Sequence, residues 1–331
     1  MAKAPKPAFP HPAAVHAGEA DILATVIANL SDDTAKLVYA DWLDDRNDPR
    51  GGVLRETLTA FRAGQKLPGP RGVPPAWRDL VGLTLLDRLA GTDFAPHADA
   101  LLALARPSIQ YALKRQGEKS LPVGGSKFGG RPDLPPALEW PRFEGLPLSF
   151  FGQFNLADLR PSPVARELPA DGVLSVFAAY RGDGDDWFPD GSWRLFHFPA
   201  AAVLARRELD DGLADESRFP PQRVSFAETL TLPKWGSPWA AELAAIGIGG
   251  YGGDFSDIYF DLAPGDHLLG YPYPIQGDIL GSKAVRHLLT INSHEEDGWM
   301  LGDGGAFYFV LPEADLKAGR FDGVQMHMDC A

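Results

Sequence analysis

The chain has 331 residues, 45% hydrophobic and 11% aromatic, which is enough to bury a sizeable core and to form two domains. Its 44 acidic and 31 basic residues give a formal net charge of −13. This charge repels nucleic acids and anionic membrane surfaces, so we expect neither as a partner.

The cysteine content and the first residues bear on location. A single cysteine, Cys330, excludes an intramolecular disulfide and gives no sign of an oxidising compartment. The beginning of the chain has repeated prolines and lacks the apolar stretch of a signal peptide. No later apolar run approaches the ~18 residues that a membrane span needs. We therefore expect a cytoplasmic protein.

The first third of the chain is predicted to be helical. Residues 1–17 are rich in proline and are expected to be disordered. Apolar residues at helical spacing then predict three short helices, which form a small module over residues 18–66. Prolines and glycines predict a linker over 67–77, and connecting helices are expected within 78–107.

From 108 to 331, prolines and glycines separate short aromatic and aliphatic runs, which is typical of strands and loops. One pattern occurs twice. Each copy has a Gly-x-Pro turn, an apolar strand ending on asparagine and a glycine-led aromatic strand: 130–132, 148–155 and 172–177, then 270–272, 287–292 and 305–309. The pattern predicts an α+β domain with duplicated, largely antiparallel sheet halves, in which Asn155 and Asn292 occupy equivalent places.

Residues 247–252 formally match the glycine fingerprint of a dinucleotide site. That site needs a strand before the glycines and a helix after them, so that backbone amides face the pyrophosphate. Here the preceding residues predict a helix, and residues 254–260 predict a strand. A helix end followed by a glycine loop is therefore favoured.

Other polar segments favour structural explanations. The glycines around Lys127 could cradle an anion, although a structural loop is favoured. The acidic loop 292–305 and the acidic turn 183–186 favour solvated loops, because neither has a regular calcium-binding pattern. Residues 327–330 match no zinc spacing. Without any known catalytic motif, we predict no catalytic residue, no metal site and no cofactor.

Three segments together carry a family resemblance: 126–135 with 139–141, 267–272 with 275–276, and 296–305. In this order they resemble the YwqG-like family of bacterial proteins, which has no known function, over about residues 108–331. The resemblance implies an α+β fold with duplicated halves and no established activity. Family members tend to carry aspartate and serine where this chain has Asn292-Ser-His. Separately, residues 37–51 resemble the bacterial repeat-companion domain, a helical module also of unknown function.

The function that we expect is a non-catalytic binding or protein-interaction module. The family resemblance suggests an immunity-like role near bacterial toxin systems, and the acidic composition would suit a basic protein partner. The alternative is an enzyme or small-ligand receptor with a polar site between the duplicated halves. The candidate residues for that site are Lys127, Gln153, Asn155, Gln276, Asn292 and Asp303.

Overall fold

The computed structural model describes residues 8–70, 72–180 and 188–330. Its helices are α1 (Glu19–Ala28), α2 (Asp33–Asp44), α3 (Arg50–Arg62), α4 (Pro75–Leu80), α5 (Leu83–Leu89), α6 (Ala98–Leu104), α7 (Leu156–Leu159), α8 (Ala240–Ala244), α9 (Asp254–Asp261) and α10 (Glu313–Lys317). Its strands are β1 (Arg106–Arg115), β2 (Lys127–Phe128), β3 (Asp133–Leu134), β4 (Arg142–Phe143), β5 (Leu146–Pro147), β6 (Ser149–Asn155), β7 (Val173–Ala178), β8 (Trp193–Phe198), β9 (Ala205–Arg206), β10 (Gln222–Thr231), β11 (His267–Leu268), β12 (Val285–Asn292), β13 (Ala306–Pro312) and β14 (Gln325–Asp329).

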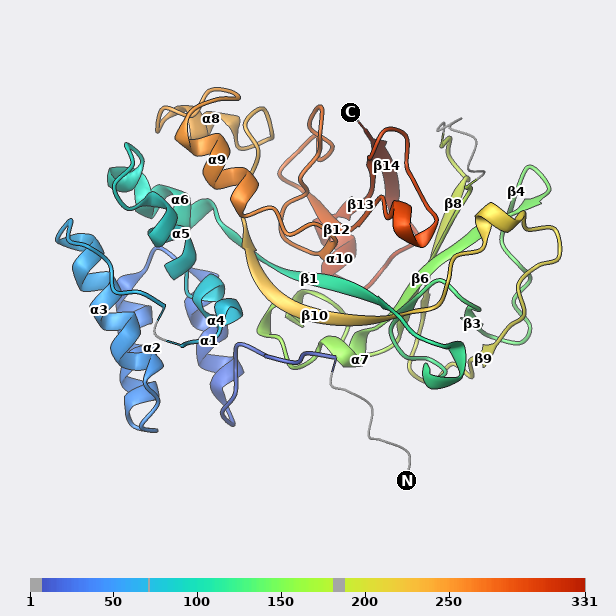
Figure 1. The fold of residues 1–331 in the computed structure, drawn as a ribbon, viewed down its shortest axis with the longest axis horizontal. Helices are drawn as coiled ribbons and strands as arrows, with labels where there is room; N and C mark the ends of the chain where they lie inside the picture. Colours follow the sequence, from blue (N-terminus) through green and yellow to red (C-terminus); the bar gives the residue numbers. More distant parts are fainter. Residues whose placement is uncertain (1–7, 71, 181–187, 331) are drawn as a thin grey trace.

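Helices α1 to α6 gather at one end of the molecule, beside the large sheet (Figure 1). The predicted cap of α2 is present, since the Asp32 carboxylate accepts a hydrogen bond from the Thr34 N–H at 2.8 Å. The expected linker over 67–77 ends early, because α4 already begins at Pro75. Proline suits a first helical position, where its missing N–H has no partner to lose. No helix in the described part of the chain is long and apolar enough to cross a bilayer.

The prediction of disorder for residues 1–17 is wrong from residue 8 onward, and residues 1–7 lie outside the described part. The backbone N–H of Phe226 donates to the carbonyl of Ala8 at 2.8 Å. Phe9 is buried against the Phe226 ring, with centroids 5.5 Å apart. The Arg50 guanidinium donates to the carbonyl of Ala13 at 2.8 Å. Apolar contacts and these hydrogen bonds therefore hold the proline-rich segment against β10 of the sheet and against α3.

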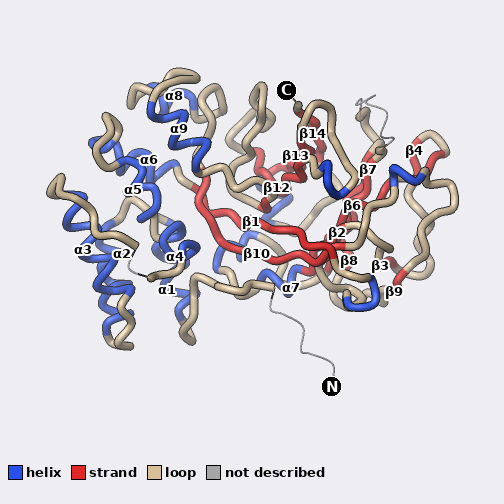
Figure 2. Tube along the Cα trace, in the orientation of Figure 1, coloured by secondary structure: helices blue, strands red, loops and turns tan. Residues whose placement is uncertain are grey.

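The main sheet of the described residues has ten strands in the order β14-β13-β12-β11-β1-β10-β2-β6-β7-β8 (Figure 2). Two short antiparallel pairs, β3 with β9 and β4 with β5, lie outside it. Strands β1 and β10 form the centre and pair antiparallel from Arg106–Thr231 to Arg115–Gln222. Read from either edge, the order places corresponding strands of the two halves at matching positions. The predicted duplication and the α+β class are confirmed.

The two halves exchange their first strands. Strand β1 comes first along the chain but pairs with β11 of the second half, and β10 pairs with β2 of the first half. The turns after the short strands also match: Gly129 and Leu269 have positive φ angles of 56° and 62°, and the next residues, Gly130 and Gly270, have 63° and 69°. Each half of the sheet is thus completed by a strand of the other half.

The predicted strand at 254–260 is wrong, since these residues form helix α9. Phe255, Ile258 and Tyr259 are buried, and their spacing places them on one helical face. The aromatic and β-branched content favoured a strand, but packing of this face against the protein decides for a helix. The core is continuous from the helical end to the sheet, from Tyr39 and Trp77 to strand residues such as Phe307.

Candidate functional site

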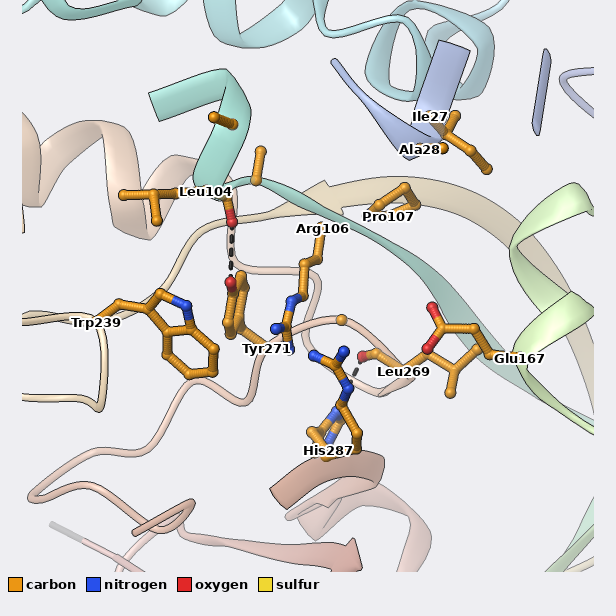
Figure 3. Close-up of a pocket in the computed structure, with 14 residues that line it drawn as sticks. Ile27, Ala28, Leu104, Arg106, Pro107, Glu167, Trp239, Leu269, Tyr271 and His287 are labelled. Atoms are coloured by element: carbon orange, nitrogen blue, oxygen red, sulfur yellow. Dashed lines mark hydrogen bonds between the residues drawn. The ribbon is translucent and has the colours of Figure 1, made fainter. Parts of the chain in front are cut away.

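A cavity of about 290 Å³ lies where the helical region, β1 and the second half meet (Figure 3). Its walls come from the end of α1, the end of α6, the start of β1, the turn after β11 and the start of β12. The lining residues are Ile27, Ala28, Ala103, Leu104, Ala105, Arg106, Pro107, Glu167, Trp239, Leu269, Gly270, Tyr271, Arg286 and His287. Residues that are distant in sequence therefore share one hollow.

Arg106, the first residue of β1, carries the most distinctive charge of this cavity. Its guanidinium carbon lies 4.7 Å from the ring centroid of Trp239 and 4.5 Å from that of Tyr271 (Figure 3). Among the described residues, no carboxylate forms an ion pair with it. Burial, with a contribution from Arg286, lowers the pKa of Arg106, yet a guanidinium keeps its charge at neutral pH. Arg106 is thus a stacked, unneutralised cation.

Hydrogen bonds hold both the side chain and the backbone of Tyr271, and this positions the arginine that stacks on its ring. Its hydroxyl donates to the carbonyl of Leu104 at 2.9 Å, and its backbone N–H donates to Thr231 Oγ1 at 3.0 Å. The tyrosine is 2% exposed, so its ring has little room to move. A cation on the face of an aromatic ring gains about 0.5–2 kcal/mol. The guanidinium is therefore oriented before any ligand binds.

Arg286 in β12 is a second cation of the cavity. Its Nη2 donates to Glu313 Oε1 at 2.8 Å. Its Nε is buried and has no hydrogen-bond partner in the part of the chain that the structure describes. An unsatisfied buried donor costs about 1–3 kcal/mol, so Arg286 gains from a ligand acceptor at this place.

The neighbouring His287 is already engaged. Its Nδ1 lies 2.9 Å from the carbonyl oxygen of Leu269, and its Nε2 lies 2.8 Å from Thr290 Oγ1. Burial holds the pKa of His287 well below its usual range, so the ring is neutral. This histidine supports the turn after β11 and has no free nitrogen for a ligand.

Glu167 supplies the negative charge of the cavity. It ends a short 3-10 helix, Pro163–Glu167, and its side chain is exposed at the rim. Surrounding protein still removes enough hydration to raise the pKa of Glu167, while Arg286 and Arg106 act in the opposite direction. Within the described ranges, no ion pair joins Glu167 to either arginine. Three charges thus surround one hollow without neutralising each other directly.

The candidate residues of the first half lie together, but they hold a loop. Gln153 Nε2 donates to the Gly125 carbonyl and to Asp133 Oδ2, both at 2.9 Å. Asn155 Nδ2 donates to the Gly124 carbonyl at 2.8 Å. Lys127 pairs with Gln153 across β2 and β6 and is fully buried. Their polar atoms are engaged within the protein.

The candidate residues of the second half each have different surroundings. Gln276 Nε2 donates to the carbonyl of Cys330 at 2.8 Å, and Asn292 Nδ2 donates to Asp266 Oδ1 at 3.1 Å. Asp303 is exposed in the loop before β13. None of the six candidates lines the cavity at Arg106, and none lines either of the other two described cavities.

The polar loops have internal partners. The Gly124 N–H donates to Asp133 Oδ2 at 2.9 Å, so a carboxylate of the chain itself occupies part of the glycine loop around Lys127. In the acidic loop, His294 Nε2 lies 2.6 Å from Asp266 and Asp297 lies 2.8 Å from Arg115. The described residues contain no group of three or more potential ligands that could hold a metal ion. The turn 183–186 lies outside the described residues.

Comparison with known proteins gives a family. A family described as "Domain of unknown function (DUF1963)" matches residues 126–330. The chain belongs to this family. The match includes every strand from β2 to β14, but the central strand β1 lies before it. No curated protein matches the chain.

Only part of the cavity lining falls within the residues of this DUF1963 member that match the family. Glu167, Trp239, Tyr271 and Arg286 lie within the matched residues, whereas Arg106 lies before them. Reasoning from sequence missed these residues, apart from placing Tyr271 in the repeated turn. No short motif connects them, because they meet only after the first strands have been exchanged.

Proposed function

We propose that this protein is a non-catalytic binding protein, and that its cavity holds a small molecule through an anionic group. The unneutralised stack of Arg106 on Trp239 and Tyr271 is the observation that carries the proposal. A guanidinium presents a planar fork of N–H donors that matches a carboxylate or a phosphate. Arg286 adds a donor, its buried Nε, that has no partner among the described residues.

The test is binding of small molecules that carry an anionic group to the full chain. Isothermal titration with leucine, succinate and inorganic phosphate should show that at least one of them binds and raises the midpoint of thermal unfolding. Arg106→Met should weaken that binding at least tenfold, because a charged hydrogen bond is worth about 1.5–3 kcal/mol. Arg320→Met is the matched control, since Arg320 is exposed and pairs with Asp315 away from the cavity. Binding that is unchanged by Arg106→Met, or absent for all three probes, would contradict the proposal.

A basic protein partner is a second candidate, favoured by the exposed face of α9. Tyr251 is 79% exposed and Phe260 is 52% exposed, and their ring centroids are 6.3 Å apart. Trp235 packs beside both rings. Asp254 and Asp257 are exposed on the same helix, and no described residue forms an ion pair with them. Exposed aromatics with adjacent charge are typical of protein interfaces, and an immunity-like role would use such a surface.

A pull-down from the native host tests this second candidate. The wild-type chain should recover a stoichiometric basic protein, and a Tyr251→Ser/Phe260→Ser double variant should lose most of it. Val203→Ser is the control, because Val203 is 77% exposed but lies in another part of the chain. A partner recovered equally well by the double variant would exclude this face as the binding surface.

The finer family resemblances are also proposals. The YwqG-like resemblance covers the same part of the chain as the DUF1963 match and is compatible with it. The repeat-companion resemblance of the N-terminal helices falls outside that match. Helices α1 to α3 do have the short helical form that the resemblance implies.

A further inference from the structure

The charges around the cavity differ in sign from one side to the other. In Figure 3, Trp239, Tyr271 and Arg106 lie together, and Glu167 lies on the far side of Arg106 from Trp239. Arg286 is the second cation of the lining and is paired on one side with Glu313, while its Nε is buried without a partner among the described residues. The two arginines have the same charge, so a carboxylate between them would offset their mutual repulsion. Glu167 would repel that same carboxylate unless the ligand also brought a positive charge.

The surface of the cavity is mostly polar with a smaller hydrocarbon part, and the space is small. Ile27, Leu104 and Pro107 contribute hydrocarbon surface beside the charged groups. The volume of about 290 Å³ is just below the roughly 300–1,000 Å³ that is usual for ligand sites. One small molecule fits, with a short apolar part and charges at one end.

We infer that the cavity takes a zwitterion of the amino-acid class, with its carboxylate on Arg106 and Arg286 and its ammonium group facing Glu167. This inference rests on the proposed small-anion function and names its ligand class. Ile27, Leu104 and Pro107 supply the hydrocarbon surface that a short aliphatic side chain would contact. Inorganic phosphate is disfavoured, because it brings no positive charge to offset Glu167.

The test compares ligands that each lack one charge. Leucine, leucinamide, N-acetylleucine and inorganic phosphate are titrated into the full chain by calorimetry. Leucine should bind at least tenfold more tightly than leucinamide, which lacks the carboxylate, and than N-acetylleucine, which lacks the ammonium group. Phosphate should bind more weakly than leucine.

A variant of Glu167 tests whether this residue recognises the ammonium group of the ligand. Glu167→Gln should abolish the preference for leucine over N-acetylleucine, because the carboxylate that faces the ammonium group has gone. The exposed position of Glu167 makes loss of folding a small risk, and thermal unfolding of the variant checks it. Glu139→Gln is the matched control, since Glu139 is also exposed but lines none of the described cavities. The control should keep the wild-type preference.

The outcomes separate this inference from the function on which it rests. If N-acetylleucine or phosphate binds as tightly as leucine, and Arg106→Met weakens it, the zwitterion is excluded while anion binding stands. If Glu167→Gln leaves the preference for leucine intact, the assigned role of Glu167 is wrong. If neither these four probes nor succinate binds, both the inference and the proposed anion site fail.

Discussion

The two halves of the sheet share a backbone but differ in the chemistry of one turn. In the first half, the N–H of Arg131 donates to the carboxylate of Glu118 at 3.0 Å. In the second half, the N–H of Tyr271 donates to the hydroxyl of Thr231 at the same distance. The two acceptors come from corresponding places, shortly after β1 and at the end of β10. A charged acceptor thus serves one turn and a neutral acceptor serves the other.

The two halves also differ in whether the charged side chains beside this turn are paired with one another. Beside the first turn, Lys127 lies 3.2 Å from Glu118, and Arg206 lies 2.7 Å from Asp133 and 2.8 Å from Glu118. Two cations and two anions neutralise one another there. In the second half, the residue corresponding to Lys127 is the neutral, buried His267, whose Nε2 lies 2.9 Å from the Tyr271 carbonyl oxygen. Of the nearby arginines, Arg286 is paired with Glu313, but Arg106 has no ion-pair partner among the described residues, which is why we place the site in the second half.

The largest expected effect comes from removing the exchanged strand. A fragment of residues 126–330, which covers the family match, lacks β1 and so leaves β10 and β11 without the strand between them. We expect this fragment to show no cooperative unfolding by circular dichroism, because the centre of the sheet is open. The full chain is the control. A native-like transition in the fragment would show that the exchange is dispensable.

The next largest effect is a difference in stability cost between variants beside the turn of the first half, which has a charged acceptor, and the turn of the second half, which has a neutral one. Asp133→Ala removes the fully buried counter-ion of Lys127 and Arg206 and leaves them only Glu118, so it should lower the free energy of unfolding by about 3–5 kcal/mol. Thr231→Val removes one neutral acceptor from the Tyr271 N–H and should cost about 1–2 kcal/mol. Urea denaturation at neutral pH measures both. Equal costs would contradict the distinction between the halves.

The central strand β10 carries a buried acidic residue that the other central strand, β1, lacks. Glu228 on β10 is 1% exposed, and neither carboxylate oxygen has a hydrogen bond of good geometry among the described residues. Burial raises the pKa of Glu228 to about 7, and Ser162 and nearby backbone amides oppose this only weakly. Its counterpart on β1 is Arg115. Glu228 lies six residues after Gln222, which pairs with β2, and Arg115 lies six residues after Ile109, which pairs with β11. The Arg115 side chain is 61% exposed.

The pH dependence follows from the direction of this shift. Between an unfolded pKa near 4.5 and the folded value near 7, the native state holds more protons than the unfolded state, so stability falls as pH rises. Glu228→Gln should remove this decline and be more stable than the wild type at pH 8 by up to about 3 kcal/mol. Urea denaturation from pH 4 to 8 measures it. A wild-type slope that persists in the variant would assign the effect to other groups.

The smallest effect concerns the two asparagines that end the matched strands. The backbone N–H of Asn155 donates to Ser126 Oγ at 2.9 Å, and that of Asn292 donates to Asp266 Oδ1 at 2.7 Å, so their positions correspond. Asn155 also caps α7, with its Oδ1 accepting from the Ala157 N–H. Asn155→Ala should therefore cost about 1–2 kcal/mol, and Asn292→Ala about half as much. A larger cost at Asn292 would reverse this order.

The sequence itself determined the repeated parts. Apolar and aromatic runs bounded by glycine and proline predicted β6, β7, β12 and β13 within one to three residues of their bounds. The repeated Gly-x-Pro turn predicted the duplication, because a glycine with positive φ fits the same sharp turn in both halves. Helices α1 to α3 followed from apolar spacing, and α2 from its Asp32 cap. These features depend on neighbouring residues, so a local pattern was sufficient.

Tertiary structure alone decided the rest. The helix at α9, the packed segment from Ala8 and the exchange of β1 and β10 depend on contacts between residues far apart in the chain. The candidate site depends on such long-range contacts more than any other feature. Arg106, Glu167 and Arg286 have no shared motif and meet only when the exchanged strand brings the start of β1 beside the second half. The predicted amides hydrogen-bond within their own halves instead, because amides take the nearest partners available, and Asp303 is exposed.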